Sequence, residues 1–436
     1  MKTVLIISPH FPPVNAPDMQ RLRQSLPFFF ENGWEAEVIT VNKDCIEINS
    51  LDNLLLENIP KNIKIHTIQA WDINKTRKFG LGSLSMRSFF HFKKAGNKIL
   101  RNKKFDLVFF STTAFHVMAL GNYWKRKFGI PFVVDVQDPW RNDFYLDKPL
   151  SERPPKFFIT YNIDKFLEAK TIPFADGIIS VSSEYINVFH QRYPSTKKTK
   201  FLILPFAGNK IDFEISNNNS TFDKSIEIDK SKKNIIYIGR GGNDLKKSTG
   251  IFFAALKEIA KEKPLLYAQI HCWFIGTSYA LSGKGLQTIL PVAESYGVEA
   301  IVTEITDRLP YFETLYYLQQ ADLLFIPGST DTAYTASKIY PYILAKKSLL
   351  AIFHKKSSVV NIINETNAGT VITFDEDENI LKQIAECKEN LLEQLFTDRE
   401  VNTNWLAFEK YTAKNMTKKM LSFFDEILEK NSSFDR

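Results

Sequence analysis

Short apolar segments alternate with helical patterns through almost the whole sequence, and this alternation restricts the fold more than any other feature. In the first half the apolar segments are residues 3–8, 37–41, 63–68, 106–111, 132–136 and 177–181. In the second half they are residues 234–238, 270–275, 300–302, 323–326, 349–352 and 369–372. Short apolar runs bounded by turn residues are typical of parallel strands covered by helices on both faces. The sequence therefore predicts an α/β fold with doubly wound parallel sheets.

The two series of segments predict two domains in tandem, residues 1–205 and 206–411. Helical patterns separate the strands near 18–31, 114–128, 155–173 and 183–192, then near 248–261, 287–296, 310–320, 338–346 and 357–364. Asparagines and mixed charges between residues 217 and 233 indicate a linker or surface loop. At 436 residues the chain also exceeds what one hydrophobic core usually supports. Further helical patterns near 378–396 and 400–430 form a tail.

Cysteine usage and hydropathy predict a cytoplasmic protein without a membrane span. Cys45, Cys272 and Cys387 lie far apart and lack metal-ligand spacing, which favours a reducing compartment. The apolar run at the N-terminus is too short for a signal sequence and suits a first strand. No apolar stretch approaches the roughly 20 residues that a membrane-spanning helix needs.

Positive charge is concentrated in one segment. The formal net charge is +7, yet residues 75–104 contain ten Lys and Arg residues and no Asp or Glu. On a helical projection, one broad arc carries Met86, Phe89, Phe90, Phe92, Gly96, Ile99 and Leu100, with basic residues beside it. A basic amphipathic helix is typical of peripheral binding to an anionic membrane, here the inner face of the plasma membrane. The alternative is an ordinary helix that packs on the sheet with a solvated basic side. No nucleic-acid partner is predicted, because no nucleic-acid motif is present.

The common nucleotide-binding fingerprints are missing. The first strand leads into Ser8-Pro9-His10-Phe11-Pro12-Pro13 with no glycine, whereas a dinucleotide-binding Rossmann domain needs G-x-G-x-x-G there. In the second domain Asp244 occupies the third glycine position of Gly239-Arg240-Gly241-Gly242-Asn243-Asp244, and no Walker A pattern occurs. The letters Asp375-Glu376-Asp377 match the D-x-D of metal-dependent sugar transferases, but their place favours a solvated turn. No metal or cofactor is predicted.

Two strand-to-helix loops of the second domain carry the groups that bind phosphate. Gly239 and Arg240 directly follow a predicted strand, and Lys246 and Lys247 come later in the same loop. The loop after residues 323–326 leads to Ser337 and Lys338 at a predicted helix start. Loops at the carboxyl ends of parallel strands bind ligands, and a helix N-terminus favours anions. Arginine and lysine together can clamp a diphosphate. The alternative is a set of solvated loop charges.

These features in this order resemble the donor domain of GT-B glycosyltransferases of the family 4 type. The matching elements are strand-Gly239-Arg240, a lysine before a helix, Ala321-Asp322, Pro327, and Ser337-Lys338-Ile339-Tyr340 ahead of Leu349-Leu350-Ala351. In the first half, Asp135-Val136-Gln137-Asp138-Pro139-Trp140 looks like the D-x-R-D-P-W signature of a bacterial subgroup that builds surface polysaccharides. The resemblance implies a GT-B fold, in which two doubly wound Rossmann-like domains face each other across a cleft. It also implies that the C-terminal helix, about 412–436, crosses back to the first domain.

The resemblance implies sugar transfer from a nucleotide-diphosphate donor to an acceptor held by the first domain. The acceptor would be a lipid-linked or surface-polysaccharide glycan, and the reaction would be metal-independent, with the anomeric configuration retained in most members. The donor diphosphate would contact Gly239, Arg240, Lys246 or Lys247, Ser337 and Lys338. Asn15 and Ala16 would lie in a cleft loop, with Arg21 just beyond it.

Asp138 and His116 are the candidate catalytic residues. Asp138 lies in the motif after a strand, where the resemblance implies a place near the reacting sugar. Its alternative is a helix N-cap with proline at the first helical position. His116 lies just past the carboxyl end of another strand and is a candidate for contact with donor or acceptor. A lone histidine there is about as often only structural.

The sequence departs from the family at two positions. The family has two glutamates eight positions apart, and the second holds the donor ribose; the corresponding positions here fall near Ala333 and Pro341. This departure keeps a non-catalytic sugar-nucleotide-binding relative as an alternative function. A GT-B-fold sugar-nucleotide epimerase is the third alternative, and it would need a set of acids and histidines that the sequence does not identify.

Overall fold

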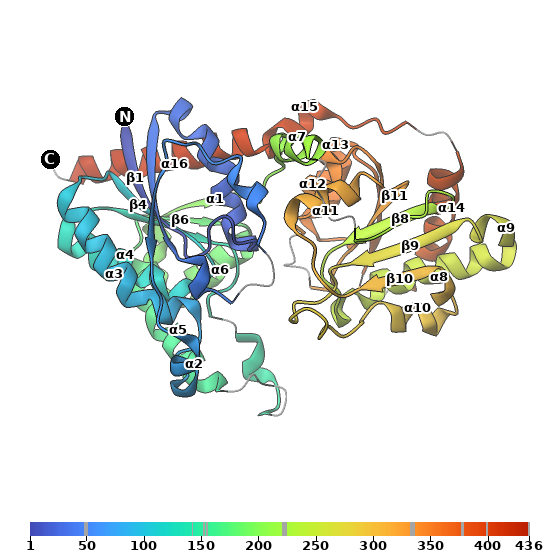
Figure 1. Cartoon of the computed structure of the whole chain (residues 1–436), viewed down its shortest axis with the longest axis horizontal. Helices are drawn as coiled ribbons and strands as arrows, with labels where there is room; N and C mark the ends of the chain where they lie inside the picture. Colours follow the sequence, from blue (N-terminus) through green and yellow to red (C-terminus); the bar gives the residue numbers. More distant parts are fainter. Residues whose placement is uncertain are drawn as a thin grey trace. The chain divides into compact units, whose positions relative to one another are not determined.

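The computed structural model divides the chain into two compact units, each built on one parallel sheet (Figure 1). It describes residues 1–47, 51–141, 143–150, 153, 156–219, 225–331, 336–375, 379–397 and 400–434. Unit 1 contains Met1–Ile48, Leu55–Phe206 and Ala413–Arg436, and unit 2 contains Asn49–Leu54 and Ala207–Thr412. The predicted class, an α/β protein with two doubly wound sheets, is confirmed.

Within the described residues the sheet of unit 1 has seven parallel strands in the order β3-β2-β1-β4-β5-β6-β7. The strands are β1 (Lys2–Ile7), β2 (Trp34–Val41), β3 (Lys64–Ile68), β4 (Leu107–Ser111), β5 (Phe132–Val136), β6 (Gly177–Ser180) and β7 (Lys200–Ile203). The main helices are α1 (Gln20–Ser25), α2 (Ile73–Thr76), α3 (Leu84–Asn102), α4 (Ala119–Phe128), α5 (Phe157–Thr171), α6 (Ser183–Arg192) and α16 (Ala413–Phe434). Strand order reverses between β1 and β4, which is the switch point of this sheet.

Successive residues of β4 pack on opposite faces of the first sheet. Phe110 lies 6.0 Å from the Trp124 ring of α4, while Phe109 lies 5.0 Å from the Phe424 ring of α16. Side chains alternate along a strand, so an apolar run such as this one fills two cores at once. Helix α16 is further attached by Asp425, whose carboxylate accepts hydrogen bonds from Lys2 and Trp34. The C-terminal helix therefore belongs to unit 1.

The sheet of unit 2 has six parallel strands in the order β10-β9-β8-β11-β12-β13 among the residues described. The strands are β8 (Lys233–Ile238), β9 (Ile270–Ile275), β10 (Val302–Ile305), β11 (Leu323–Pro327), β12 (Ser348–His354) and β13 (Thr370–Phe374). The helices are α7 (Lys210–Asn218), α8 (Lys246–Glu262), α9 (Pro264–Tyr267), α10 (Leu290–Tyr296), α11 (Tyr311–Leu318), α12 (Ile339–Leu344), α13 (Ser358–Thr366), α14 (Leu381–Phe396) and α15 (Trp405–Phe408). Phe252 of α8 stacks on Phe325 of β11 with ring centroids 4.1 Å apart. The switch point lies between β8 and β11.

Several predicted elements differ from the structure. Strand β7 was not predicted, because its side chains are only half-buried and its apolar run is short. The helix expected over 18–31 is a short α1 between 3-10 turns, and Pro27 lies in the turn that follows α1. The helix expected over 400–430 is divided into α15 and α16, because Thr412 between them is extended.

Helix α3 packs its apolar side into the core of unit 1. Phe92 and Leu100 are buried, and a Cβ added to Gly96 would lie 2.2 Å from the Trp124 indole. Glycine at this position therefore lets α3 approach α4 closely. Most of the apolar arc predicted for residues 86–101 is thus covered by protein, with Phe90 as an exposed exception. The part of 75–104 that solvent reaches is mainly its basic side.

Candidate functional site

The predicted donor residues lie at the switch point of the second sheet. Gly239 and Arg240 follow β8, and Lys338 ends the loop that follows β11. The two strands are paired in parallel, so both loops leave the same edge of the sheet. The amide of Thr330 in the second loop donates a 3.0 Å hydrogen bond to the carbonyl of Asp244 in the first. Ligands of open α/β sheets bind at such a point.

Lys338 is folded over the end of β8. Its Nζ lies 2.8 Å from the Tyr237 hydroxyl and 4.6 Å from the centroid of the Tyr237 ring. A Cβ added to Gly239 would lie 2.0 Å from this Nζ, so only glycine leaves room for the ammonium group. Gly239 and Lys338 therefore form one arrangement, although they are 99 positions apart in the sequence (338 − 239).

Three cations lie near one another at this edge. Burial, together with the charges of Arg240 and Arg308, lowers the pKa of Lys338 from 10.5 to about 7. Arg308 follows β10 and was not predicted, because the sequence pattern placed that strand at 300–302, whereas β10 runs from Val302 to Ile305. A cluster of like charges that lower a neighbour's pKa is suited to an anionic ligand.

Arg240 is held in place by Asp244. The two guanidinium Nη atoms lie 2.8 and 2.6 Å from the two carboxylate oxygens, which is bidentate geometry. Burial opposes ionisation of Asp244, but hydrogen bonds from Arg240 and Ser329 prevail and lower the pKa of this carboxyl below its usual range. The residue that occupies the third glycine position of the absent dinucleotide fingerprint thus orients the arginine of the loop.

The other predicted donor residues are placed differently. Lys246 is exposed at the first position of α8, and Ser337 is exposed just before α12. The Nζ of Lys247 donates a hydrogen bond to the carbonyl of Asp375 and lies 5.6 Å from the centroid of the Phe374 ring. Lys247 is therefore directed to the end of β13, whereas Gly239, Arg240 and Lys338 meet at the end of β8.

Glu304 supports the loop region beside the cations. Its buried carboxylate accepts hydrogen bonds from the Thr277 hydroxyl and from the amides of Thr288, Ile289 and Leu290, at 2.7 to 3.0 Å. Sequence reasoning missed this residue, because a carboxylate inside a strand carries no recognisable pattern. A buried charge of this kind is tolerated because several donors satisfy it.

A second polar network lies at the switch point of the first sheet. Asp18 accepts hydrogen bonds from Thr112 at 2.9 Å and from the Thr113 amide at 3.1 Å, and its carboxylate lies 3.0 Å from Nδ1 of His10. Burial opposes both charges, but the ion pair prevails: it raises the pKa of His10 and lowers the pKa of Asp18. Asp18 joins the loops that follow β1 and β4.

Two residues of the Asp135–Trp140 motif are structural. Asp135 is buried, and its Oδ2 lies 2.8 Å from both Nε of Arg21 and Nε2 of Gln137. Gln137 also donates to the carbonyl of Asp18 at 3.1 Å. Arg21 donates further to the carbonyls of Leu204 and Pro205, at 2.7 and 3.1 Å. The motif therefore ties the loop after β1 to the end of unit 1, and Arg21 is part of this buried network.

The candidate catalytic residues have contrasting surroundings. The Asp138 side chain reaches solvent, yet partial burial of its carboxyl and the charge of Asp18 raise the pKa of this group. No helix begins at Pro139 within described residues 137–141, so the helix-cap alternative does not apply. His116 contacts Ser85 through Nδ1 at 2.5 Å and Asp164 through Nε2 at 2.9 Å. The His116 ring thus lies between Ser85 and Asp164, which favours a positioning role.

The loop of Asn15 and Ala16 precedes the 3-10 turn that carries Asp18. Both residues are half-buried, and the amide of Ala16 donates to the carbonyl of Val14 at 3.1 Å.

Of the predicted acid positions, Pro341 lies inside α12, and Ala333 lies outside the described residues. In the part of the chain that the structure describes, no group of three or more His, Cys, Asp and Glu residues could hold a metal ion. No described helix is both long and apolar enough to cross a membrane.

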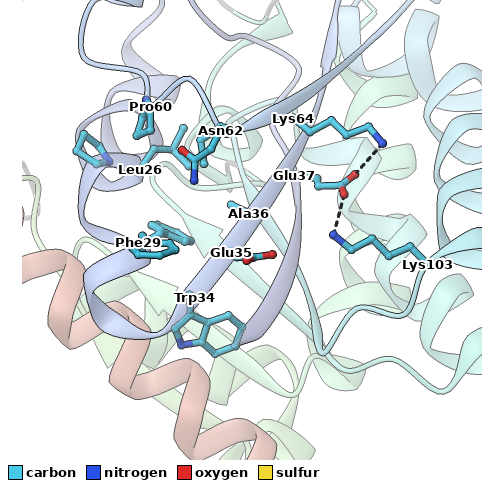
Figure 2. A pocket seen from close by; sticks show the side chains of 13 residues that line it. Leu26, Phe29, Trp34, Glu35, Ala36, Glu37, Pro60, Asn62, Lys64 and Lys103 are labelled. Atoms are coloured by element: carbon cyan, nitrogen blue, oxygen red, sulfur yellow. Dashed lines mark hydrogen bonds and ion pairs between the residues drawn. The ribbon is translucent and has the colours of Figure 1, made fainter.

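A pocket at the β2–β3 side of unit 1 is lined by none of the candidate site residues (Figure 2). Its volume is about 310 Å³, and its lining includes Leu26, Phe29 and Trp34. Glu37 at its rim lies 2.9 Å from Nζ of Lys103 and 2.6 Å from Nε2 of His66. Although burial opposes ionisation, the hydrogen bonds from His66 and Lys103 lower the pKa of Glu37. The carboxylate of Glu37 is thus paired with groups beside the pocket.

Solved structures match the chain over nearly its full length. The N-terminal domain of Candida albicans trehalose-6-phosphate phosphatase has 14% identity and a TM-score of 0.62, covering 98% of this chain and 97% of that one. A Rickettsia africae glycosyltransferase has 14% identity and a TM-score of 0.56, with 98% of each chain covered. An Escherichia coli protein described as trehalose-6-phosphate bound with UDP-2-fluoro glucose has 11% identity and a TM-score of 0.57, with 97% and 99% covered. These likenesses establish the GT-B fold.

Comparison of the sequence alone with known proteins found no match. No family model matches the sequence, and no curated protein is similar to it in sequence. The fold is therefore shown by structure alone, and the family 4 resemblance and the D-x-R-D-P-W-type subgroup stay predictions.

Proposed function

We propose that the protein is a glycosyltransferase that moves a sugar from a nucleotide-diphosphate donor to an acceptor. The observation that carries the proposal is the cation group Arg240, Lys338 and Arg308 at the carboxyl edge of the second sheet. A nucleotide diphosphate needs positive charge at the leaving group, where negative charge grows during transfer. The Escherichia coli structure with bound UDP-2-fluoro glucose has the same fold, which supports a sugar nucleotide as the donor.

Lys338 would change its charge when the donor binds. With a pKa of about 7, the free lysine is largely neutral at pH 8. A diphosphate beside it favours the ammonium form, so the proposed binding step takes up a proton. Arg240 contributes a permanent charge, and a guanidinium has five N–H donors, more than Asp244 uses. The diphosphate would thus offset the burial and the arginine charges that keep Lys338 neutral in the free protein.

We further propose a lipid-linked or surface-polysaccharide acceptor, transfer with retention, and no metal ion. Unit 1 would hold the acceptor, and the basic side of residues 75–104 supports a location at an anionic membrane surface on the cytoplasmic side. Asp138 is the better candidate for contact with the reacting sugar, because its carboxylate is partly exposed and its pKa is raised. His116 would act through its neighbours.

A donor titration tests the proposal. UDP-, GDP- and dTDP-sugars are titrated calorimetrically at pH 8 in buffers that differ in ionisation enthalpy, and donor hydrolysis is followed in parallel. We expect uptake of up to roughly 0.9 proton at pH 8, the neutral fraction for a pKa near 7, and much less at pH 6. Lys338→Ala should remove this uptake and weaken binding at least tenfold, an effect on the order of 1.4 kcal/mol or more.

The matched control is Lys261→Ala, an exposed lysine at the other end of α8 that pairs with Glu258. The control should bind as the wild type does. A folded protein that binds none of these nucleotides would exclude the donor site, and equal binding by Lys338→Ala and the wild type would show that it lies elsewhere.

A non-catalytic sugar-nucleotide-binding protein is the second candidate. It is favoured by Pro341, which stands in α12 where the family has the acid that holds the donor ribose. The same titration separates the two functions. Binding with proton uptake but no turnover with any donor, in the presence of lipid and glycan acceptors, would support the non-catalytic protein.

A further inference from the structure

The outer face of α5 exposes large apolar side chains. Phe158, Ile159 and Phe166 are 52%, 62% and 61% exposed. At about 100° per residue they lie within roughly 100° of one another around the helix, so they share one face. Phe157, Glu168 and Thr171 of the same helix are buried against the rest of unit 1. Single exposed apolar residues are ordinary, but a cluster on one helix face marks an interaction site.

The segment before α5 extends this face. The Arg153 guanidinium lies 5.2 Å from the ring centroid of Phe158 and donates to the carbonyls of Lys148 and Leu146, each at 2.7 Å. Leu146 and Leu150 are both exposed, Leu150 to 74%. Arg153 thus holds the loop beside the helix. We call the set Leu146, Leu150, Arg153, Phe158, Ile159 and Phe166 the α5 surface.

The exposed charges of α5 are positive. Lys165 and Lys170 are exposed beside the apolar residues, and Nζ of Lys170 lies 5.9 Å from the ring centroid of Phe166. The two acids of α5 face the protein: Asp164 lies 2.9 Å from Nε2 of His116, and buried Glu168 lies 3.1 Å from Nη1 of Arg192. The helix therefore presents aromatic and aliphatic groups between lysines.

The basic segment 75–104 lies next to the start of α5. A Cβ added to Gly80 would lie 3.9 Å from Cδ of Lys156, the residue just before the helix. His116 also joins the two helices, because it contacts Ser85 of α3 and Asp164 of α5. The beginning of the basic segment, around residues 80–85, therefore lies near the α5 surface.

We propose that the α5 surface docks on an anionic lipid bilayer. Phe158, Ile159 and Phe166 enter the boundary between headgroups and acyl chains, while Arg153, Lys165 and Lys170 contact anionic headgroups. Apolar anchors flanked by lysines are the arrangement that binds such a surface, and each basic residue adds to the attraction. A second copy of the chain is disfavoured as the occupant, because two such faces would bring like charges together.

The α5 surface supplies the apolar contact that α3 lacks, since the apolar side of α3 is buried. Basic residues 75–104 then add long-range attraction only. This docking deepens the proposed action on a lipid-linked acceptor, but it does not depend on sugar transfer and stands if the protein transfers nothing.

Vesicle co-sedimentation of the full chain tests the docking. The probe is a vesicle of about 30% phosphatidylglycerol in phosphatidylcholine, compared with phosphatidylcholine alone. The triple variant Phe158→Ser, Ile159→Ser, Phe166→Ser should lose at least about tenfold in partitioning onto the anionic vesicle. Lys165→Glu with Lys170→Glu should lose binding that the wild type shows at low salt. The matched control is Leu265→Ser with Leu406→Ser, two leucines of unit 2 that are 83% and 87% exposed.

All variants change exposed side chains, and circular dichroism and thermal melts show whether each is folded. The proposal is supported if the wild type and the control bind the anionic vesicle equally and both α5 variants lose this binding. Absence of wild-type binding to the anionic vesicle overturns it, as does equal binding by the triple variant. A wild-type dimer in light scattering that the triple variant loses would assign the surface to self-association and also overturn it. Sugar-nucleotide titration of the triple variant keeps this result separate from the donor site, since docking can fail while donor binding persists.

Discussion

Replacement of Lys338 with methionine should stabilise the free protein, although it removes the proposed phosphate contact. One pH unit corresponds to about 1.4 kcal/mol between the protonated and neutral forms of a group. The difference between 10.5 and about 7 therefore implies a cost on the order of 4 to 5 kcal/mol for charging Lys338 in the folded chain. Loss of the hydrogen bond to Tyr237 and of the contact with its ring offsets part of this gain. We expect a net stabilisation of about 1–3 kcal/mol at pH 6.

The pH dependence of the stability difference between wild type and variant shows whether the charge on Lys338 causes it. Below pH 7 both the folded and the unfolded chain carry the charge, so the full cost is present. Between about pH 7 and 10.5 only the unfolded chain binds the proton, so the contribution of Lys338 to the free energy of unfolding rises with pH by about 1.4 kcal/mol per unit. The advantage of Lys338→Met over the wild type should therefore shrink steadily over this range.

Urea denaturation at several pH values from 6 to about 9.5 measures the effect. Only the difference between wild type and variant is used, because other groups titrate over the same range in both proteins. Lys261→Met, which changes an exposed lysine of α8, should follow the wild type at every pH. A difference between wild type and Lys338→Met that stays constant with pH would refute the reasoning, as would a variant that is less stable than the wild type at pH 6.

Three further predictions concern single residues. Gly239→Ala should displace Lys338, because the new Cβ would lie 2.0 Å from its Nζ; the pH-dependent advantage of Lys338→Met should then be smaller in this background, and an unchanged advantage would contradict the proposed contact. Arg21→Met removes the positive charge beside buried Asp135 and the donor to the carbonyls of Leu204 and Pro205, and should cost about 3–5 kcal/mol in urea denaturation; a loss below about 1 kcal/mol would argue against this network. Asp18→Asn should bring the raised pKa of His10 down, because burial then acts alone. An NMR titration of His10 checks this. The ion pair stabilises the fold above the range where Asp18 is protonated and loses its effect as pH rises through the pKa of His10.

Strand segments with clear apolar runs were predictable, and those with mixed character were not. The runs at 106–111, 132–136 and 323–326 were predicted because every residue of such a strand is buried on a covered sheet. Strand β7, with half-buried residues, carries no such run. Strand β10 contains Glu304, which is buried because it holds the amides at residues 288–290. A local pattern does not report a partner that lies outside the segment.

The candidate site shows the same division. Gly239, Arg240 and Lys338 were predicted because they follow strands whose carboxyl ends share an edge. The separation of Lys247 from Arg240, the pairing of Arg240 with Asp244, and the presence of Arg308 could not be predicted. Each depends on the direction of a flexible side chain, which is set by neighbours far along the sequence.

The two doubly wound sheets are written in the amino-acid pattern, because the burial of short strands on both faces demands apolar residues at consecutive positions. The sequence also indicated the loops of the candidate donor site, because glycines and cations follow those strands. Which of these side chains meet depends on the folded chain, since strand order brings β8 beside β11 and β1 beside β4. The folded chain also covers the apolar side of α3 and leaves the apolar face of α5 exposed. Helical periodicity reports that a helix has an apolar side, but the surrounding elements determine whether protein or another surface covers it.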